Sequence, residues 1–334
     1  MNPKYFLKAV GLLVLALSLV LAGCEGDAGP AGPAGVAGVP GAEGTASCIE
    51  CHDDSNLITG KEIQWAESAH GTGEAYVRGT SSSCAGCHSG NAFADMVNAG
   101  LNPSEVTEGD TDPTRQDCRA CHLIHDTYDS ADFALRTVDP VDFYAIPGTT
   151  FDGGMGNLCV NCHQPRRVMA EPVEGIVSGI NSHWGPHHGP QSAMMMGVAG
   201  EGVTGSPSSH YTDTRMENSC YTCHMGDDAN HTFEVDDNRC QSCHDGLNGF
   251  DYNGVQTEIK DLANVLGDLL VTAGLIDENS EDGHAIVSSA PTPQATALWN
   301  WIYVVHEDKS FGVHNSDYAR DLLQVGIDNL QPAP

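Results

Sequence analysis

Basic residues are scarce in this chain of 334 residues. Lysine and arginine total 14 against 45 acidic residues, which gives a formal net charge of −31. A surface this acidic repels phosphate backbones and anionic lipid headgroups, so nucleic acid is excluded as a partner. We expect cationic partners instead, such as basic proteins, metal ions or metal-oxide surfaces. The plainer alternative is that the acidity only keeps the protein soluble.

Aromatic side chains are also few. They make up 6% of the residues and charged residues 18%, whereas there are 38 glycines and 17 prolines. A chain of this length normally buries more large apolar side chains than this composition supplies. The composition therefore predicts a mainly α-helical fold with extensive loop and little or no sheet, in which a bound group completes the interior.

The cysteines leave no pair of thiols for a disulfide, because twelve of the thirteen fall into six copies of one pattern, Cys-x-x-Cys-His. The cysteines of the pattern are Cys48, Cys51, Cys84, Cys87, Cys118, Cys121, Cys159, Cys162, Cys220, Cys223, Cys240 and Cys243. The histidines that follow them are His52, His88, His122, His163, His224 and His244.

This pattern is typical of covalent haem c attachment. Two cysteines three apart lie on one side of a helical turn and reach the two vinyl groups of one porphyrin. The adjacent histidine is then held beneath the ring as the proximal iron ligand. We therefore predict six haem c groups that stack to form the core. Zinc ribbons are the alternative, but they do not require a histidine after every second cysteine.

Ten further histidines are candidates for the second axial ligand of each iron: His70, His125, His183, His187, His188, His210, His231, His284, His306 and His314. His125 follows His122 by three residues, so on a helix both would point from one face, and we expect His125 to serve a neighbouring haem. His70 follows a predicted helix, and His231 lies between the fifth and sixth motifs. His284 and His306 stand in acidic surroundings, where we expect residues at the surface or behind a ligand rather than iron ligands.

Several local patterns resemble bacterial multihaem cytochromes c, a group distantly similar to the pentahaem, ammonia-forming nitrite reductases. The patterns are Pro186-His187-His188-Gly-Pro-Gln191, Ser208-Ser209-His210, Cys223-His224-Met225, His231-Thr232-Phe233 and Gly312-Val-His314-Asn315. The resemblance covers about residues 48–334. It implies that His187, His210, His231 and His314 are distal ligands, and with His70 and His125 the number equals that of the irons. His188 and, more remotely, His183 are rivals of His187.

One departure from the reductases favours electron transfer over catalysis. Their catalytic haem is attached through a motif that ends in lysine, whereas all six motifs here end in histidine. Iron with two histidines is closed to substrates, so we assign no catalytic residue. A multihaem reductase of nitrite, hydroxylamine or a sulfur oxyanion is the alternative function. Met194, Met195 and Met196 offer a sulfur ligand, although clustered methionines more often pack against a haem face.

The beginning of the chain predicts export and anchoring. Residues 1–23 have a positively charged start and a short apolar run, and they end in Leu21-Ala22-Gly23-Cys24, which resembles a bacterial lipoprotein signal. That resemblance implies lipid on Cys24 and, because Glu25 rather than Asp follows, the outer membrane. The alternative is an ordinary secretory signal with Cys24 incidental.

The predicted tether, residues 24–46, contains a triplet run over 26–46 with glycine at every third position from Gly26 to Gly44, which is a collagen-like composition. We expect an extended tether of up to about 65 Å, at about 3.1 Å per residue. A trimerising stalk is the alternative, and it makes an oligomer possible.

The six motifs all lie in residues 47–248, and residues 249–334 have none. We expect this second region to form a helical bracket packed on the haem array. Its first helix would present Ile259, Leu262, Leu266, Leu269 and Leu270 on one face. A second would follow Pro293 with Trp299, Ile302 and Tyr303, and Ser316 would cap a third that carries Leu322, Leu323, Ile327 and Leu330.

These patterns together predict a lipid-anchored, six-haem electron carrier at the outer membrane, on its periplasmic face or at the cell surface. It would pass electrons from a periplasmic or outer-membrane donor to a partner protein or to an extracellular acceptor such as ferric minerals. A conducting filament of stacked subunits is a third hypothesis, which the lipid anchor and the glycine-rich tether disfavour.

Overall fold

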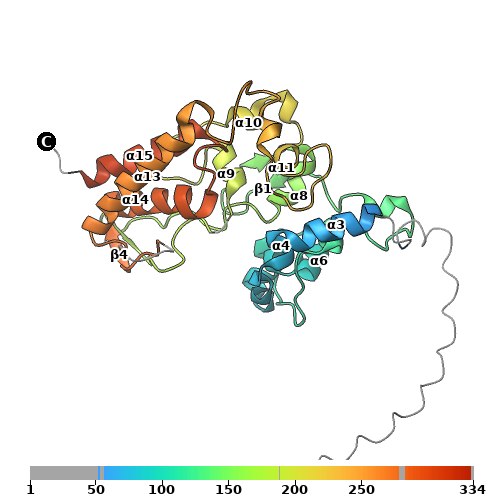
Figure 1. The fold of residues 1–334 in the computed structure, drawn as a ribbon. Coiled ribbons are helices and arrows are strands. Elements are labelled where there is room, and N and C mark those ends of the chain that lie inside the picture. Colours follow the sequence, from blue (N-terminus) through green and yellow to red (C-terminus); the bar gives the residue numbers. More distant parts are fainter. Residues whose placement is uncertain (1–51, 53–55, 188, 278–282, 332–334) are drawn as a thin grey trace, which may run out of the picture. The chain divides into compact units, whose positions relative to one another are not determined.

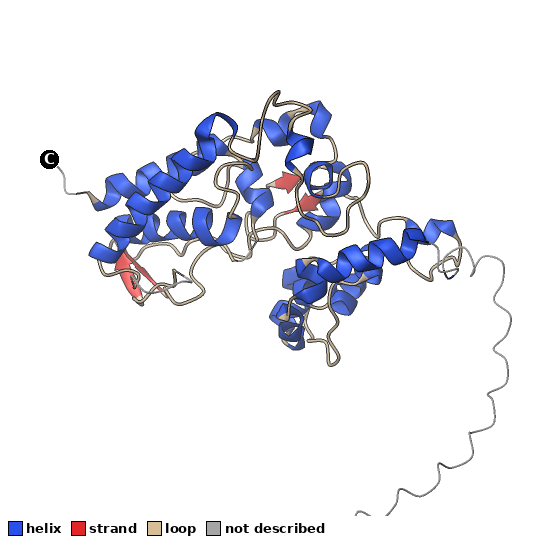
Figure 2. Ribbon diagram, viewed as in Figure 1, coloured by secondary structure: helices blue, strands red, loops and turns tan. Residues whose placement is uncertain are grey.

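The computed structural model describes residues 52, 56–187, 189–277 and 283–331, all within the compact unit Thr45–Pro334. The predicted signal and tether lie outside the described residues, as do Cys48, Cys51 and His188. Helices and loops dominate and strands are few (Figure 2), which confirms the mainly α prediction. In the described ranges, no helix combines the length and the apolar character needed to cross a bilayer.

The α-helices follow one another along the chain as in Figure 1. They are α3 (Asn56–Glu67), α4 (Ala69–Thr72), α5 (Ser82–His88), α6 (Gly90–Asn98), α7 (Cys118–Cys121), α8 (Asn157–Val160), α9 (Gln191–Met196), α10 (Ser209–Thr212), α11 (Cys220–His224), α12 (Asp237–Cys240), α13 (Val255–Thr272), α14 (Thr292–Ile302) and α15 (Ser316–Leu330).

Shorter pieces connect these helices. Six are 3-10 turns: η1 (Ala75–Thr80), η2 (Pro103–Glu105), η3 (Ser130–Phe133), η4 (Gly154–Gly156), η5 (Thr214–Met216) and η6 (Tyr252–Gly254). A π-helical turn, η7 (Tyr303–Asp308), continues α14.

Two small antiparallel sheets complete the described fold. Strands β1 (Val141–Asp142) and β2 (Thr150–Phe151) pair with Val141 opposite Phe151. Strands β3 (Ile176–Ser178) and β4 (Ser289–Pro291) pair with Val177 opposite Ala290, so this sheet joins the middle of the chain to the segment before α14.

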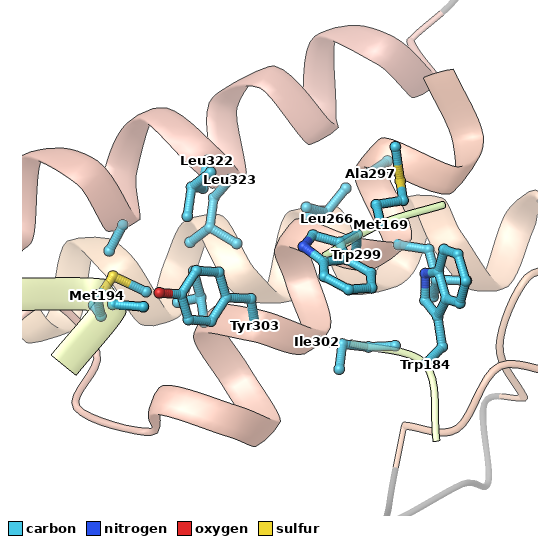
Figure 3. Close-up of a cluster of buried hydrophobic side chains, with 14 of the residues drawn as sticks. Met169, Trp184, Met194, Leu266, Ala297, Trp299, Ile302, Tyr303, Leu322 and Leu323 are labelled. Atoms are coloured by element: carbon cyan, nitrogen blue, oxygen red, sulfur yellow. The ribbon is translucent and has the colours of Figure 1, made fainter. Parts of the chain in front are cut away.

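Helices α13, α14 and α15 form the bracket predicted for the end of the chain. Leu266 of α13, Trp299 of α14 and Leu322 of α15 are fully buried in one hydrophobic cluster (Figure 3). Pro293 stands in the first turn of α14, where a missing N–H costs nothing. Gly326 of α15 lets two helices approach, because a Cβ there would lie 2.6 Å from Leu266.

The predicted cap of α15 was wrong by one residue. Asn315, not Ser316, is the cap, and its side chain accepts a hydrogen bond from the N–H of Tyr318 at 3.2 Å. Its side-chain amide also donates to the carbonyl oxygens of Met194 and Ser206, at 3.1 and 2.9 Å. Asparagine both caps the helix and ties it to α9, whereas a serine hydroxyl is too short to do both.

The hydrophobic cluster also contains residues from segments that precede the bracket in the sequence. Phe143, Phe151, Val177 and Trp184 belong to it, and the ring of Trp184 meets that of Trp299 edge to face at 5.2 Å. A smaller cluster holds Phe93, Met96, Ala120 and Leu158. Side chains therefore build more of the interior than the composition suggested.

Candidate haem sites

The motifs are numbered 1 to 6 in chain order: 48–52, 84–88, 118–122, 159–163, 220–224 and 240–244. Motifs 2 and 5 lie inside α5 and α11. In motifs 3, 4 and 6 the histidine N–H donates to the carbonyl oxygen of the first cysteine at 2.8, 2.9 and 2.9 Å. Each described motif is thus one helical turn, as its spacing predicts.

Acidic caps start two of these turns. The carboxylate of Asp117 accepts hydrogen bonds from the N–H groups of Arg119 and Ala120, directly before motif 3. Asp236 accepts from the N–H of Asn238 ahead of motif 6. Because each cap satisfies N–H groups that the helix leaves unpaired, the turn that carries the cysteines is stabilised where it begins.

Each motif histidine faces one of the six predicted distal histidines. The ring centres are 6.2 Å apart for His52 and His125, 6.4 Å for His88 and His187, 6.2 Å for His122 and His231, 6.3 Å for His163 and His70, 6.4 Å for His224 and His314, and 6.0 Å for His244 and His210.

These separations fit one metal ion between two imidazoles. A metal–imidazole bond is about 2.0 Å, and the ring nitrogen lies about 1.1 Å from the ring centre, so two axial rings have centres about 6.2 Å apart. In the near-parallel pairs, such as His122 and His231, whose planes are 27° apart, the ring centres are 6.2 Å apart, which is too far for direct ring stacking. The residues present thus fit iron held between two histidines.

Hydrogen bonds hold six of these rings by Nδ1 and leave Nε2 for a metal. Four of them donate to backbone carbonyl oxygens: His122 to Phe133 (2.7 Å), His210 to Val313 (2.7 Å), His224 to Phe233 (2.8 Å) and His231 to Ala229 (2.7 Å). The other two donate to side chains: His163 to Gln191 Oε1 (3.0 Å) and His314 to Asp308 Oδ1 (2.6 Å). Such outer partners orient metal-bound histidines and fix their tautomer.

All twelve paired histidines line a single cavity of about 2660 Å³, and so do the ten described cysteines of the motifs. A site for one small ligand has about 300–1,000 Å³, so this cavity has room for several cofactors. His183, His284 and His306 lie on a separate cavity of about 30 Å³.

Burial favours the neutral form of four of the twelve paired imidazoles. Burial, with a smaller contribution from His163, lowers the pKa of His70 to about 4. Burial also lowers the pKa values of His88, His224 and His231. Neutral imidazole is the form that binds a metal. His314 is the exception, because Asp308 raises its pKa although burial opposes the charge.

Cysteines of different motifs lie close together. The Sγ atom of Cys162 lies 4.0 Å from the carbonyl oxygen of Cys87, which brings motifs 2 and 4 together. The side chains of Cys159 and Cys220 are close enough for each to shift the pKa of the other, which brings motifs 4 and 5 together. No disulfide links the described cysteines, and among the described residues no cluster of three or more Cys, His, Asp or Glu could hold a bare metal ion.

The helix expected to carry both His122 and His125 is not present. Helix α7 ends at Cys121, and His125 has a positive φ of 67°. The buried carboxylate of Asp132 accepts the N–H groups of His125 (2.7 Å), Thr127 (2.7 Å) and Tyr128 (3.2 Å), which makes a turn out of the segment. His125 nevertheless faces His52 rather than His122, as expected for a residue that serves another haem.

The remaining candidates lie elsewhere. His183 is exposed and contacts Ser182 at 3.2 Å. His284 is exposed, and His306 is half-buried with its ring centre 4.9 Å from that of Trp301.

Met194 and Met195 are buried in the hydrophobic cluster and Met196 packs against it, as the packing interpretation of this group expects. Gln191 ends one of the patterns quoted from the sequence, but its contact with His163 was not predicted, and Asp308 was not singled out at all. Only the fold brings these two residues to the histidines that they hold.

No family model matches the chain, and no curated protein matches it. Among solved structures, the "Crystal Structure of Outer Cell Wall Cytochrome OcwA" is similar, with a TM-score of 0.51 and 25% identity over 81% of this chain. The chain spans 50% of the length of that cytochrome. The similarity supports a chain of the multihaem cytochrome kind.

Proposed function

We propose that this protein is an electron-transfer cytochrome with six covalently attached haem c groups. One observation carries the proposal: six histidine pairs with ring centres 6.0–6.4 Å apart line a single cavity together with the motif cysteines. Haem iron supplies a one-electron couple when bound, with a potential that follows its axial ligands.

The chain's own residues do the rest. Each cysteine pair would anchor a porphyrin edge, and each histidine pair would close both faces of the iron. The Nδ1 hydrogen bonds of His122, His163 and their counterparts hold the rings in place. A site closed on both faces leaves no position for a substrate, which favours electron transfer over the reductase alternative.

The contacts between motifs support transfer within the molecule. Motif 4 lies close to motif 2 through Cys162 and Cys87, and close to motif 5 through Cys159 and Cys220. Groups bound at these motifs would lie against one another. Motif 4 would then be a junction rather than the end of the array.

The cellular setting we propose follows from the beginning of the chain. Residues 1–23 would direct export, lipid on Cys24 would anchor the protein at the outer membrane, and residues 24–46 would act as tether for the haem region 47–248 and the bracket 249–334. The similar solved structure is that of an outer cell wall cytochrome, which supports a location outside the cytoplasm. The partners would be redox proteins or an extracellular metal or mineral acceptor.

Reoxidation of the reduced protein tests this function. The holoprotein is reduced with dithionite, freed of excess reductant and mixed with ferric citrate or with nitrite in a stopped-flow spectrometer. We expect ferric citrate to reoxidise all six haems and nitrite to yield no ammonium. In a parallel assay, nitrite is supplied together with an excess of reduced methyl viologen as the electron source, since each ammonium formed consumes six electrons. Sustained ammonium formation over many turnovers in that assay would instead establish the reductase alternative.

A further inference from the structure

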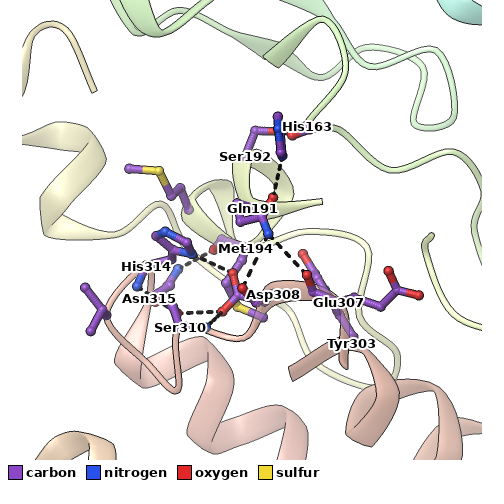
Figure 4. A network of polar contacts seen from close by, with 12 residues as sticks. His163, Gln191, Ser192, Met194, Tyr303, Glu307, Asp308, Ser310, His314 and Asn315 are labelled. Atoms are coloured by element: carbon purple, nitrogen blue, oxygen red, sulfur yellow. Dashed lines mark hydrogen bonds and ion pairs between the residues drawn. The ribbon is translucent and has the colours of Figure 1, made fainter. Parts of the chain in front are cut away.

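His314 differs from the other histidines whose Nδ1 partner is described. Five of those six Nδ1 hydrogen bonds end on a neutral carbonyl or amide oxygen, whereas that of His314 ends on the carboxylate of Asp308. The two atoms are 2.6 Å apart, and the Asp308 side chain is 0% exposed. Figure 4 shows the pair at the end of η7, next to Ser310.

Three donors converge on this carboxylate. Its Oδ1 accepts from His314, and its Oδ2 accepts from the N–H of Ser310 at 3.1 Å and from the Ser310 hydroxyl at 2.5 Å. Hydrogen bonds donated to a carboxylate favour its ionised form. This carboxylate lies, shielded from water, directly behind one of the twelve paired imidazoles.

The neighbouring motif provides the contrast. The Nδ1 of His163 in motif 4 also bonds a side chain, but the partner is the amide oxygen of Gln191 at 3.0 Å. Gln191 in turn donates to the carbonyl oxygens of Glu307 and Asp308, at 3.2 and 3.4 Å (Figure 4). Motifs 4 and 5, whose cysteines lie close together, thus have outer partners of similar kind and different charge.

We propose that Asp308 is a positioning residue that lowers the reduction potential of the haem held between His224 and His314. The inference rests on the proposed function. A carboxylate behind the ligand makes the imidazole a stronger electron donor, and a stronger donor stabilises ferric over ferrous iron. The motif 5 haem is then a stronger reductant than it would be with a neutral partner, which favours electron flow from motif 5 to motif 4.

The test is Asp308→Asn in the holoprotein, followed by a potentiometric titration monitored by optical and electron paramagnetic resonance (EPR) spectra. We expect one of the six reduction steps to move to higher potential while all irons stay low-spin. Outer partners of metal ligands typically change binding by 10- to 100-fold. We expect about tenfold in the reduction equilibrium constant, which is about 59 mV for one electron.

Two further variants make the test independent of the folding of the first. Gln191→Glu places a carboxylate behind His163, and a different step should then move to lower potential. Ser310→Ala removes one donor but keeps the carboxylate, so no step should move upward.

An Asp308→Asn titration that superimposes on that of the wild type, with six low-spin haems, would overturn this inference and leave the proposed function standing. A purely structural role would instead give a high-spin iron with the other steps unshifted, and it would equally overturn the inference. If Asp308→Asn fails to fold, a Gln191→Glu titration in which no reduction step moves would overturn the inference. A wild-type protein without haem would remove the proposed function itself.

Discussion

The ring centres of His187 and His88 lie 6.4 Å apart, and the planes of the two imidazoles are at 66° to each other. His187 reaches this position with a positive φ of 85°, a backbone conformation that non-glycine residues adopt rarely. The backbone at His187 is therefore strained in the conformation that places this ring opposite His88. Strain of this kind is found most often at functional positions.

Replacing His187 should open one iron. His187→Ala removes the ring opposite His88, and we expect one of six haems to become high-spin and, once reduced, to bind carbon monoxide. The matched control is His183→Ala, four residues away and exposed, which should leave all six low-spin. Optical and EPR spectra report both states. A high-spin haem in His183→Ala but not in His187→Ala would show that His183, rather than His187, is the distal ligand.

Asp132 should matter to the motif 1 site although its described hydrogen bonds are to residues outside the motifs. Its carboxylate holds the N–H groups of His125 and Thr127, and Asp132→Ala leaves these donors without an acceptor, at about 1–3 kcal/mol. We expect His125 to lose its fixed position, so that a fraction of one haem becomes high-spin.

Asp129→Ala is the comparison for Asp132→Ala. Asp129 accepts the N–H of Ala131 at the start of η3 but not that of His125, so the ligand set should be kept. Equal high-spin fractions in the two variants would contradict the role given to Asp132.

Glu307 should make stability depend on pH. Burial raises its pKa to about 7, against smaller opposing effects of Lys309 and Arg167, whereas glutamate in an unfolded chain has a pKa of about 4.3. Between these values the folded state binds more protons, so stability falls as pH rises from about 4.3 to 7. The loss above pH 7 is roughly 3–4 kcal/mol.

Glu307→Gln should remove this dependence. At pH 8 the variant should melt several degrees above the wild type, and at pH 4 the difference should be nearly lost. Glu234→Gln, at an exposed position, should not alter the pH profile. Thermal unfolding followed by circular dichroism measures both. A Glu307→Gln profile parallel to that of the wild type would show that Glu307 is ionised in both states.

The bracket should be stable through its own side chains. Leu266→Ala creates a cavity among α13, α14 and α15 and should cost about 2–5 kcal/mol. Val265 neighbours it on the same helix but is 47% exposed, so Val265→Ala should change stability little. Denaturant unfolding of both holoproteins gives the comparison, and similar losses would argue against a tightly packed bracket.

Much of this molecule was predictable because its signals are local. A Cys-x-x-Cys-His stretch forms its helical turn through a hydrogen bond between its own residues, such as His163 and Cys159. The bracket helices follow from apolar spacing and from Pro293. What the sequence could not predict depends on partners distant in the chain: Asp308 behind His314, Gln191 behind His163, and Trp184 against Trp299.

Two local predictions failed for a related reason. The carboxylate of Asp132 accepts hydrogen bonds from N–H groups that would have bonded to backbone carbonyl oxygens in a helix through His125. Asn315 displaces Ser316 as a cap because it also bonds Met194 and Ser206. In both cases one side chain with several hydrogen-bonding atoms bonds several backbone groups at once, which helix propensity and residue spacing do not encode.

The most direct test is a haem assay of the purified, exported protein combined with EPR spin quantitation of its oxidised form. We predict six haems per chain and six low-spin irons. The signals should differ in shape, because the ring planes range from 27° apart for His122 and His231 to 81° for His210 and His244. A colourless protein, or a stoichiometric high-spin iron, would contradict paired histidines at every site.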